Sequence, residues 1–230
     1  MQGTGQAAHL TGSGHAAMPR PMTMLYRLDA PAPAVARIFG AQAHDDPWDG
    51  GHVAPGGFAP VITAGREMVA GPRPAARTPR RMVPRLWGVP PPPSVQDGRP
   101  VLSVRNLESP FWIGNLRNSE FRCLVPATAF MEWGRPSPAD GKRAQCWFSC
   151  ADQPVFAIAG VWKDSDIPTF ALLTCKANAA MRTEGRETMP AILPPDPAAH
   201  ETWLRGGWEQ ARALLRPYSS SLMLMRLPAP

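Results

Sequence analysis

The sequence predicts a mainly antiparallel α+β domain, built from short strands with a few short helices. Proline is the first reason, because 29 of the 230 residues are prolines, against roughly 5% in average proteins, and proline interrupts helices. The second reason is the apolar fraction of 44%, which suffices for a buried core. The third is the order of the elements: strand-like segments follow one another with few helices between them, which is typical of antiparallel sheets rather than βαβ winding.

The first 21 residues are expected to form a flexible tail, and residues 22–227 a single folded domain. Glycine, alanine, serine and threonine dominate the tail, and such a composition buries too little apolar surface to fold. The tail lacks a basic start and an apolar stretch, so we do not expect a secretory signal. No apolar run in the chain approaches the length of a transmembrane helix. We therefore expect a cytoplasmic protein that does not enter a membrane.

The folded part is predicted to begin with a strand at 24–28 and a short helix over 32–39. Asp29 is expected to cap this helix and Gly40 to end it, because these residue types favour those positions. A long stretch rich in turn residues, arginine and proline follows. Within it the pattern predicts only two short strands, around Met82-Val83 and Leu86-Trp87.

The second half of the chain carries clearer signals. Four short apolar runs bounded by turn residues predict strands, at 121–126, 144–149, 155–161 and 170–174. Asp196 followed by a proline predicts the start of a helix. A pair of glycines interrupts that helix, which resumes over 208–215, and a last strand is expected at 221–227.

Charge is concentrated in one quarter of the chain. Residues 66–122 hold ten arginines, no lysine and four acidic residues, so ten minus four gives +6, which equals the net charge of the whole protein. Arginine binds phosphate through its planar fork and stacks on bases. The same segment contains Trp87, Phe111 and Trp112, and a basic and aromatic mixture is typical of single-strand binding. A solvated arginine-rich loop without a ligand is the alternative.

The four cysteines form no C-x-x-C pair. Cys146 and Cys150 lie four residues apart in a predicted strand, which places them on one face but too far apart to clamp a metal. We expect free, buried thiols in a reducing compartment. The sequence predicts neither a metal nor a cofactor.

Seven motifs occur together in one order and spacing. They are VAPG (53–56), RLWGV (85–89), SVRNLESPFW (103–112), RCLVPATAFMEW (122–133), FAIAGVW (156–162), LLTCKAN (172–178) and MPAIL (189–193). In this the chain resembles the SOS-response-associated peptidase (SRAP) family over residues 22–227. The resemblance implies a single domain around a curved, barrel-like, mainly antiparallel sheet, with a few short peripheral helices. It also implies a monomer with a basic groove for single-stranded DNA that contains abasic sites.

The family's chemistry uses an N-terminal cysteine, exposed when the first methionine is removed. Its α-amine attacks the aldehyde of the abasic sugar, and the thiol captures the imine as a thiazolidine, which cross-links protein and DNA. A glutamate and a histidine move protons, an asparagine positions the sugar and an arginine holds phosphate. By this resemblance, Glu132 is the acid/base glutamate and Arg105 the phosphate-binding arginine. Thr174, Trp87 and Pro55 line the groove.

Three positions depart from the family pattern. Thr23 stands in place of the cysteine, Ser103 in place of the asparagine and Gly185 in place of the histidine. A hydroxyl closes such a ring far less readily than a thiolate. The histidine's proton transfer typically contributes about a hundred- to ten-thousand-fold in rate. Thr23 has a free amine only if translation begins at Met22 or the tail is removed.

Individual side chains have two interpretations. Trp112, like Trp87, is a candidate stacking residue, although a tryptophan in a strand is more often part of the core. Trp133, Trp147 and Trp162 are assigned to the core.

Three hypotheses follow. The first, which we favour, is a SRAP-like protein that binds single-stranded, abasic DNA in a DNA-damage (SOS) response with its cross-linking activity lost or weakened. The second is an active cross-linking enzyme that uses the Thr23 amine. The third is a non-catalytic protein that keeps the fold to bind a partner, which fold alone does not exclude.

Overall fold

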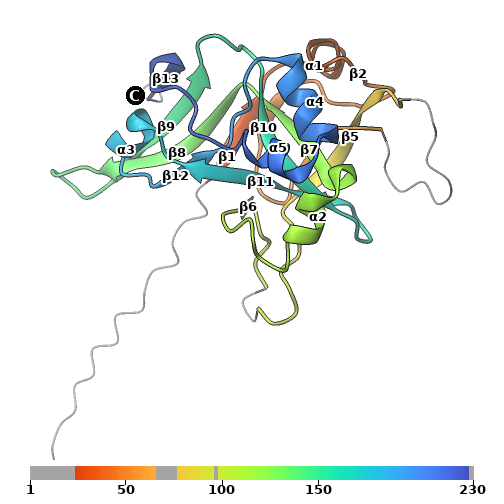
Figure 1. Cartoon of the computed structure of the whole chain (residues 1–230). Helices are drawn as coiled ribbons and strands as arrows, with labels where there is room; N and C mark the ends of the chain where they lie inside the picture. The colour runs from red at the N-terminus through yellow and green to blue at the C-terminus, as the bar shows by residue number, and fades with distance from the viewer. Residues whose placement is uncertain (1–23, 66–76, 96–97, 228–230) are drawn as a thin grey trace, which may run out of the picture.

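The computed structural model describes residues 24–65, 77–95 and 98–227. The chain forms two curved β-sheets, with short helices on the outside (Figure 1). Most strand pairs are antiparallel, and the sheets curve without closing into a barrel, so the predicted α+β class with a curved, mainly antiparallel sheet is confirmed. The predicted tail, residues 1–21, lies outside the described residues.

The first sheet has five strands in the order β13-β9-β8-β1-β3. All of its pairings are antiparallel, and β8 lies between β9 and β1. The strands span Leu25–Leu28 (β1), Gly51–Val53 (β3), Ala129–Pro136 (β8), Arg143–Cys150 (β9) and Met223–Arg226 (β13).

The second sheet has the order β12-β11-β10-β7-β4-β5-β2, with β6 beside β11. Its few parallel pairings are β11 with β5, β11 with β6 and β2 with β5. The strands span Ala41–Gln42 (β2), Phe58–Thr63 (β4), Arg80–Trp87 (β5), Ser103–Val104 (β6), Arg122–Ala127 (β7), Phe156–Lys163 (β10), Thr169–Lys176 (β11) and Thr188–Pro190 (β12).

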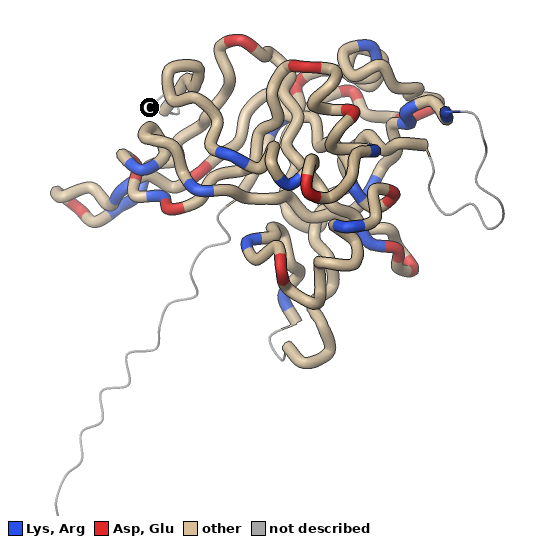
Figure 2. Tube along the Cα trace, viewed as in Figure 1, with Lys and Arg blue, Asp and Glu red and all other residues tan. Residues whose placement is uncertain are grey.

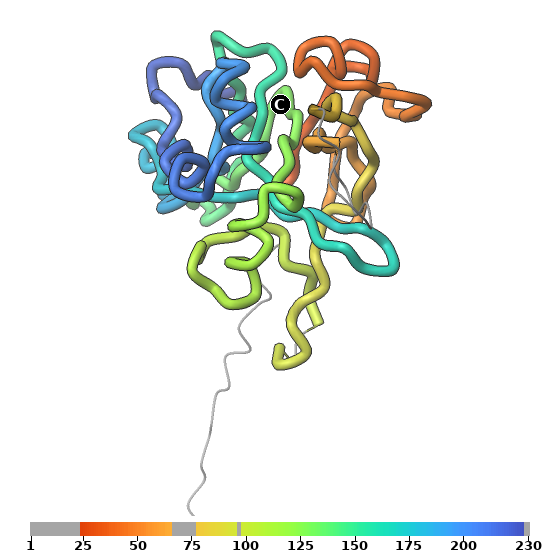
Figure 3. The backbone as a smooth tube through the Cα atoms, turned by 45° about the vertical axis from the view of Figure 1, so that its right-hand side comes forward, coloured from red at the N-terminus to blue at the C-terminus, as the bar shows by residue number. Residues whose placement is uncertain are grey.

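The helices of the described residues are all short. They span Ala32–Phe39 (α1), Ile113–Arg117 (α2), Ala179–Thr183 (α3), Pro197–Arg205 (α4) and Trp208–Arg212 (α5). None of them is long and apolar enough to cross a membrane. Between β5 and α2 the chain runs mainly in loops that project below the sheets in Figures 1 and 3, and β6 is the part of it that pairs with β11.

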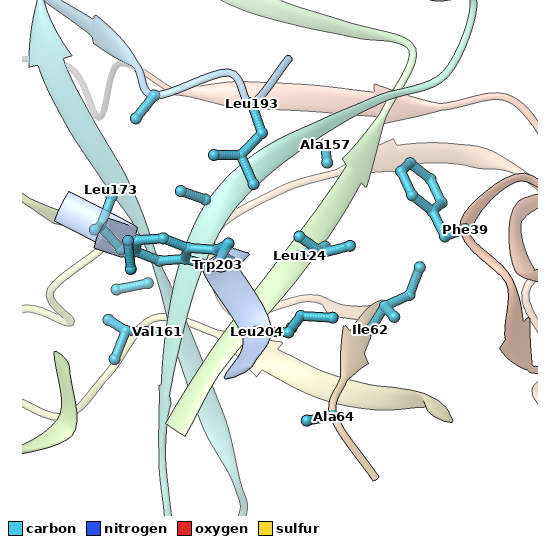
Figure 4. Packing of buried hydrophobic residues seen from close by; sticks show 14 of the residues in the cluster. Phe39, Ile62, Ala64, Leu124, Ala157, Val161, Leu173, Leu193, Trp203 and Leu204 are labelled. Atoms are coloured by element: carbon cyan, nitrogen blue, oxygen red, sulfur yellow. The ribbon is translucent and has the colours of Figure 1, made fainter. Parts of the chain in front are cut away.

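Two layers of core hold these elements together. The inner faces of the two sheets pack against each other, where Phe130 of β8 contacts Phe156 of β10 at 6.4 Å between ring centroids. The second layer lies between the second sheet and the helices, where Trp203 and Leu204 of α4 pack over Leu124 of β7 (Figure 4). Every residue of β7 is buried, because its two faces belong to different layers.

Helix α4 is tied to β7 by side-chain contacts as well as by packing. The indole Nε1 of Trp203 donates to the carbonyl of Cys123 at 2.8 Å. The Arg122 guanidinium donates to the Gly206 carbonyl and lies 5.6 Å from the Trp203 ring. Burial lowers the pKa of Arg122 to about 10. This arginine of the basic segment is therefore part of the core.

Most of the predicted elements are present. The strands expected at 24–28, 121–126, 144–149, 155–161 and 170–174 correspond to β1, β7, β9, β10 and β11. The helix after Asp196 is α4, and Asp196 accepts the amide of Ala198 as expected of a cap. The segment predicted to continue as a helix over 208–215 ends at Arg212, and a 3₁₀ turn at Ser220–Leu222 shortens the last strand.

Two predictions about the first half are corrected. Helix α1 ends at Gly40, which adopts φ of 58°, but Pro31 rather than Asp29 occupies the position before it. Asp29 accepts hydrogen bonds from Arg27 and Thr128 instead. The two short strands expected near Met82 and Leu86 are one continuous strand, β5, because Pro84 lies opposite Pro60 of β4 and neither has an N–H to donate.

Candidate functional site

Glu132 lies on the inner face of β8, near the edge of the core. It follows Phe130 by two residues and therefore shares its face, and in the sheet it lies opposite Cys146 of β9. The residue is only 4% exposed. The carboxyl group of Glu132 is thus held in the apolar interface between the sheets, and a buried carboxylate requires a partner of opposite charge.

Arg186 supplies that partner. It lies in the loop between α3 and β12, and its guanidinium forms a direct ion pair with the carboxylate of Glu132. Burial raises the pKa of Glu132, while Arg186 and, more weakly, Arg105 act to lower it. Arg105 is therefore within electrostatic reach of Glu132.

Arg105 is positioned by β6, which ends one residue before it. Strand β6 pairs in parallel with β11 through Ser103 and Val104. The Thr174 hydroxyl donates to the Val104 carbonyl at 3.0 Å, which fixes the end of β6. The side chain of Arg105 itself is exposed. Ser103 and Thr174 thus support the segment that presents Arg105, and Thr174 is 7% exposed.

Gly185 occupies a backbone conformation that explains its identity. It follows α3 with φ of 74°, and its N–H donates to the carbonyl of Arg182 at 2.9 Å. A side chain other than glycine's is strained at such a φ, and an added Cβ would lie 3.4 Å from Cγ of Arg135. The turn places the next residue, Arg186, where its guanidinium contacts the carboxylate of Glu132. Sequence reasoning missed Arg186, which no pattern in the chain singles out.

Cys146 is a thiol close to Glu132, and its environment keeps it protonated. Its Sγ lies 3.8 Å from Oε2 of Glu184. Burial raises the pKa of Cys146, and the negative charge of Glu184 raises it further. Gly134 makes room for this pair, because a Cβ there would come within 3.0 Å of both atoms. A protonated thiol is a weak nucleophile, so Cys146 does not replace the cysteine that the family pattern places at the N-terminus.

The aromatic residues predicted to stack on DNA are buried. Trp87 is fully buried, donates from Nε1 to the Leu102 carbonyl at 3.1 Å and contacts Tyr26. Trp112 is 4% exposed and packs against a neighbouring ring. Neither indole offers a face to a base in this structure. Pro55 is half-buried, in a turn hydrogen-bonded to Trp87 through Gly56. Thr23 lies outside the described residues.

Two tryptophans assigned to the core are partly exposed instead. Trp133 follows Glu132 and therefore faces the opposite side of β8, where it is half-buried. Trp147 of β9 is half-buried on the same outer face, 5.5 Å from the His52 ring and 5.9 Å from the Arg27 guanidinium. Only Trp162 of the three belongs to the core, at 1% exposed. The alternation along β8 is the signal that would have identified Trp133.

The arginines of the basic segment that the structure describes do not line one surface. Arg122 is in the core, and Arg85 lies over the Trp162 ring at 4.9 Å. Arg80 donates to the carbonyl of Phe39 at the end of α1. Lys and Arg occur at both ends of the molecule and along its middle (Figure 2). The candidate nucleic-acid interface therefore depends on local groups such as Arg105 and Arg186.

Metal ligation has no support among residues 24–65, 77–95 and 98–227. No group of three or more His, Cys, Asp or Glu side chains in those ranges could hold a metal ion. All four cysteines are free, and three of them are buried.

The fold and this site define an α+β protein of two curved sheets with a buried glutamate–arginine pair on the inner face of β8. The profile of the SOS response associated peptidase (SRAP) family matches residues 22–228. The chain belongs to that family. A comparison with curated protein sequences finds no significant match.

Crystal structures with the same fold come from two bacteria. A protein from Bacteroides thetaiotaomicron is 23% identical, with 88% of this chain and 90% of that chain covered and a TM-score of 0.68. A protein from Bordetella bronchiseptica is 20% identical, with coverage of 90% and 100% and a TM-score of 0.66. A phage-related protein from the same organism is 13% identical, with coverage of 90% and 94% and a TM-score of 0.65. At these identities the likeness establishes the fold.

Proposed function

We propose that this protein binds single-stranded, abasic-site-containing DNA at the Glu132 site in a DNA-damage response, without forming a stable covalent cross-link. The observation that carries the proposal is the ion pair between Arg186 and the buried Glu132, on whose carboxyl the charge of Arg105 also acts. Guanidinium groups are suited to phosphate contacts. Membership of the SRAP family supports the link to DNA damage.

The loss of stable cross-linking is inferred from the groups that surround Glu132. Arg186 already forms an ion pair with the carboxylate of Glu132, so Glu132 can transfer a proton only after that ion pair opens. Gly185 has no imidazole that could take part in proton transfer. The nearby Cys146 is held in its protonated form. Thr23, which stands where the family has cysteine, carries a hydroxyl that captures an imine weakly.

The binding test is a titration of abasic single-stranded DNA at several salt concentrations. We expect log K to fall linearly with log [salt], with a slope near −0.7 for each neutralised phosphate. Arg105→Gln should reduce that slope by about 0.7 and weaken binding roughly tenfold. Arg117→Gln, which removes an exposed arginine of α2, is the matched control. Equal behaviour of the two variants, or a flat salt response, would indicate a protein that keeps the fold to bind another partner.

One observation favours the second candidate, an active enzyme that uses the Thr23 amine. Burial moves the pKa of Glu132 upward, toward the range in which a carboxyl group transfers protons at neutral pH. In that reaction the amine forms an N–C bond with the aldehyde carbon, water leaves and an imine results. Borohydride would reduce the imine to a stable amine. A DNA adduct on a chain that verifiably begins at Thr23 would establish this activity, and its absence would support non-covalent binding.

A further inference from the structure

A second arginine cluster lies away from Glu132, where α1, α4 and the start of β5 meet. A cavity of about 380 Å³ opens there, lined by Gly40, Arg77, Thr78, Pro79, Arg80 and Arg205. In Figure 1, α1, α4 and β5 lie toward one end of the molecule, and α3 and β12, which flank Arg186, lie toward the other. The cavity therefore belongs to a different site from the one proposed to bind abasic DNA.

Two of these arginines are held rigidly by backbone carbonyls. Arg80 donates from Nη1 to the carbonyl of Phe39 at 2.8 Å, where α1 ends. Arg205 donates from Nη2 to the carbonyls of Ala64 and Thr78, at 2.9 and 2.7 Å. Their side chains are only 13% and 16% exposed. Their positive charges are thus fixed at the wall of the cavity before any ligand arrives.

One carboxylate, that of Glu201 in α4, forms ion pairs with all three arginines. It contacts Arg77 at 2.5 Å, Arg80 at 3.0 Å and Arg205 at 2.8 Å. Burial would raise the pKa of Glu201, but hydrogen bonds from Arg80 and Arg77 and the charge of Arg205 lower it. These four residues comprise three guanidinium groups and one carboxylate. A guanidinium-rich wall beside an open cavity favours an anionic ligand.

The third arginine is the most exposed of the three. The side chain of Arg77 is 68% exposed, and Nη2 of its guanidinium contacts Glu201. A guanidinium group carries five N–H donors. Gly40 leaves the opposite wall open, because a Cβ there would meet nothing within 4 Å. Arg77 is therefore positioned to close over a group held by Arg80 and Arg205.

We propose that this cavity binds a phosphate monoester, either the terminal phosphate of a nucleic-acid strand or the phosphate of a free nucleotide. A phosphate monoester carries about −1.5 to −2 charges at neutral pH, and guanidinium groups are suited to such an anion. Its oxygens accept paired hydrogen bonds from guanidinium forks. The cavity is open to solvent, and its volume is within the range of small-molecule sites, about 300 to 1,000 Å³.

The first test is calorimetric titration of the full chain with deoxycytidine 5′-monophosphate, with deoxycytidine as the uncharged control. We expect the monophosphate to bind and the nucleoside not to bind. Arg77→Gln should weaken the monophosphate roughly tenfold, because one charge-assisted contact is lost. Arg77 is exposed, so this variant keeps the fold. Arg117→Gln removes the same charge elsewhere and should bind as the wild-type protein does.

Absence of binding by the wild-type protein would overturn the proposal, and so would equal weakening by Arg77→Gln and Arg117→Gln. The source of the phosphate is decided with oligonucleotides that carry either a 5′-phosphate or a 5′-hydroxyl. A preference for the 5′-phosphate that disappears in Arg77→Gln identifies a strand end, and binding of the mononucleotide alone identifies a free nucleotide. Arg105→Gln should retain the monophosphate, which keeps this result separate from that of the abasic-DNA experiment.

Discussion

The two glutamate–arginine groups of this protein combine the same side chains in different surroundings. Glu132 has one direct partner, Arg186, and is 4% exposed. Glu201 has three partners, and its side chain is 26% exposed. Burial dominates at the first and raises the pKa of Glu132, whereas hydrogen bonds and positive charges outweigh burial at the second and lower the pKa of Glu201.

The comparison shows how desolvation sets the behaviour of a carboxylate. A buried ion pair gives up the hydration of both charges, so its net contribution is small even though breaking it is costly. A partly solvated carboxylate with several cations keeps much of its hydration. The Glu132 group is therefore fixed and sensitive to the loss of a partner, and the Glu201 group combines three guanidinium groups with one carboxylate. Four measurements sharpen or break this comparison.

Removal of the partner of Glu132 should have the largest effect. Arg186→Ala leaves a buried carboxylate without its counter-charge, and we expect the free energy of unfolding to fall by about 3 kcal/mol in urea titrations. Arg212→Ala is the matched control, because the Arg212–Glu108 pair is exposed on both sides, at 46% and 54%. That control should change stability by no more than about 1 kcal/mol. Equal losses would show that burial does not distinguish the two pairs.

The shared carboxylate of the other group should matter less. Glu201→Gln keeps the shape and part of the hydrogen bonding of Glu201 but removes the charge that balances three arginines, so we expect a loss of about 2 kcal/mol. Glu209→Gln, on exposed α5 surface, serves as the control. A stabilised Glu201→Gln protein would contradict the role given to Glu201.

The loss in Glu201→Gln should depend on pH in a defined direction. The pKa of Glu201 is lowered in the folded protein, so its stabilising contribution is present above the unfolded pKa. It is lost as the pH falls through the lowered, folded value. The stability difference between wild type and Glu201→Gln should therefore shrink on acidification. A difference that grows below pH 4.5 would contradict the sign.

The smallest expected effect is on the ionisation of Glu132 and Glu201, which can be measured in the folded protein. Carboxyl NMR signals should show Glu132 titrating above the ordinary glutamate pKa and Glu201 below it. Because the folded pKa of Glu132 is raised, its ionisation costs stability as the pH rises from the unfolded pKa through the folded one. In Arg186→Gln the pKa of Glu132 should rise further, because the contributions of Arg186 that lower it are gone. An unchanged pKa of Glu132 in Arg186→Gln would show that Arg186 does not influence the ionisation of Glu132.

The local patterns that predicted elements correctly were those decided by neighbouring residues. Alternating or continuous apolar runs identified β7, β9, β10 and β11, and the left-handed Gly40 ended α1. The failures occurred where distant residues decide. Strand β5 continues through Pro84 because Pro60 of β4 lies opposite it. Asp29 does not cap α1, because its carboxylate accepts a hydrogen bond from Thr128, 99 residues away.

The candidate site was predicted in the same uneven way. Glu132 and Arg105 were proposed from motifs, and the charge of Arg105 acts to lower the pKa of Glu132. Arg186 was missed because its role depends on the turn at Gly185. The burial of Trp87 depends on packing against Tyr26 and Phe170, which belong to other strands. Residue type alone carried no information about those contacts.

The attachment of α4 to β7 has a consequence for synthesis on the ribosome. Trp203 comes 80 residues after Cys123, to whose carbonyl it donates. Until those residues emerge, the outer face of β7 has no helix over it, and the guanidinium of Arg122 has no Gly206 carbonyl to receive it. An emerging chain exposes apolar surface for that interval, and such surface attracts chaperones or other nascent chains. Helix α4 therefore covers a strand that was translated well before it.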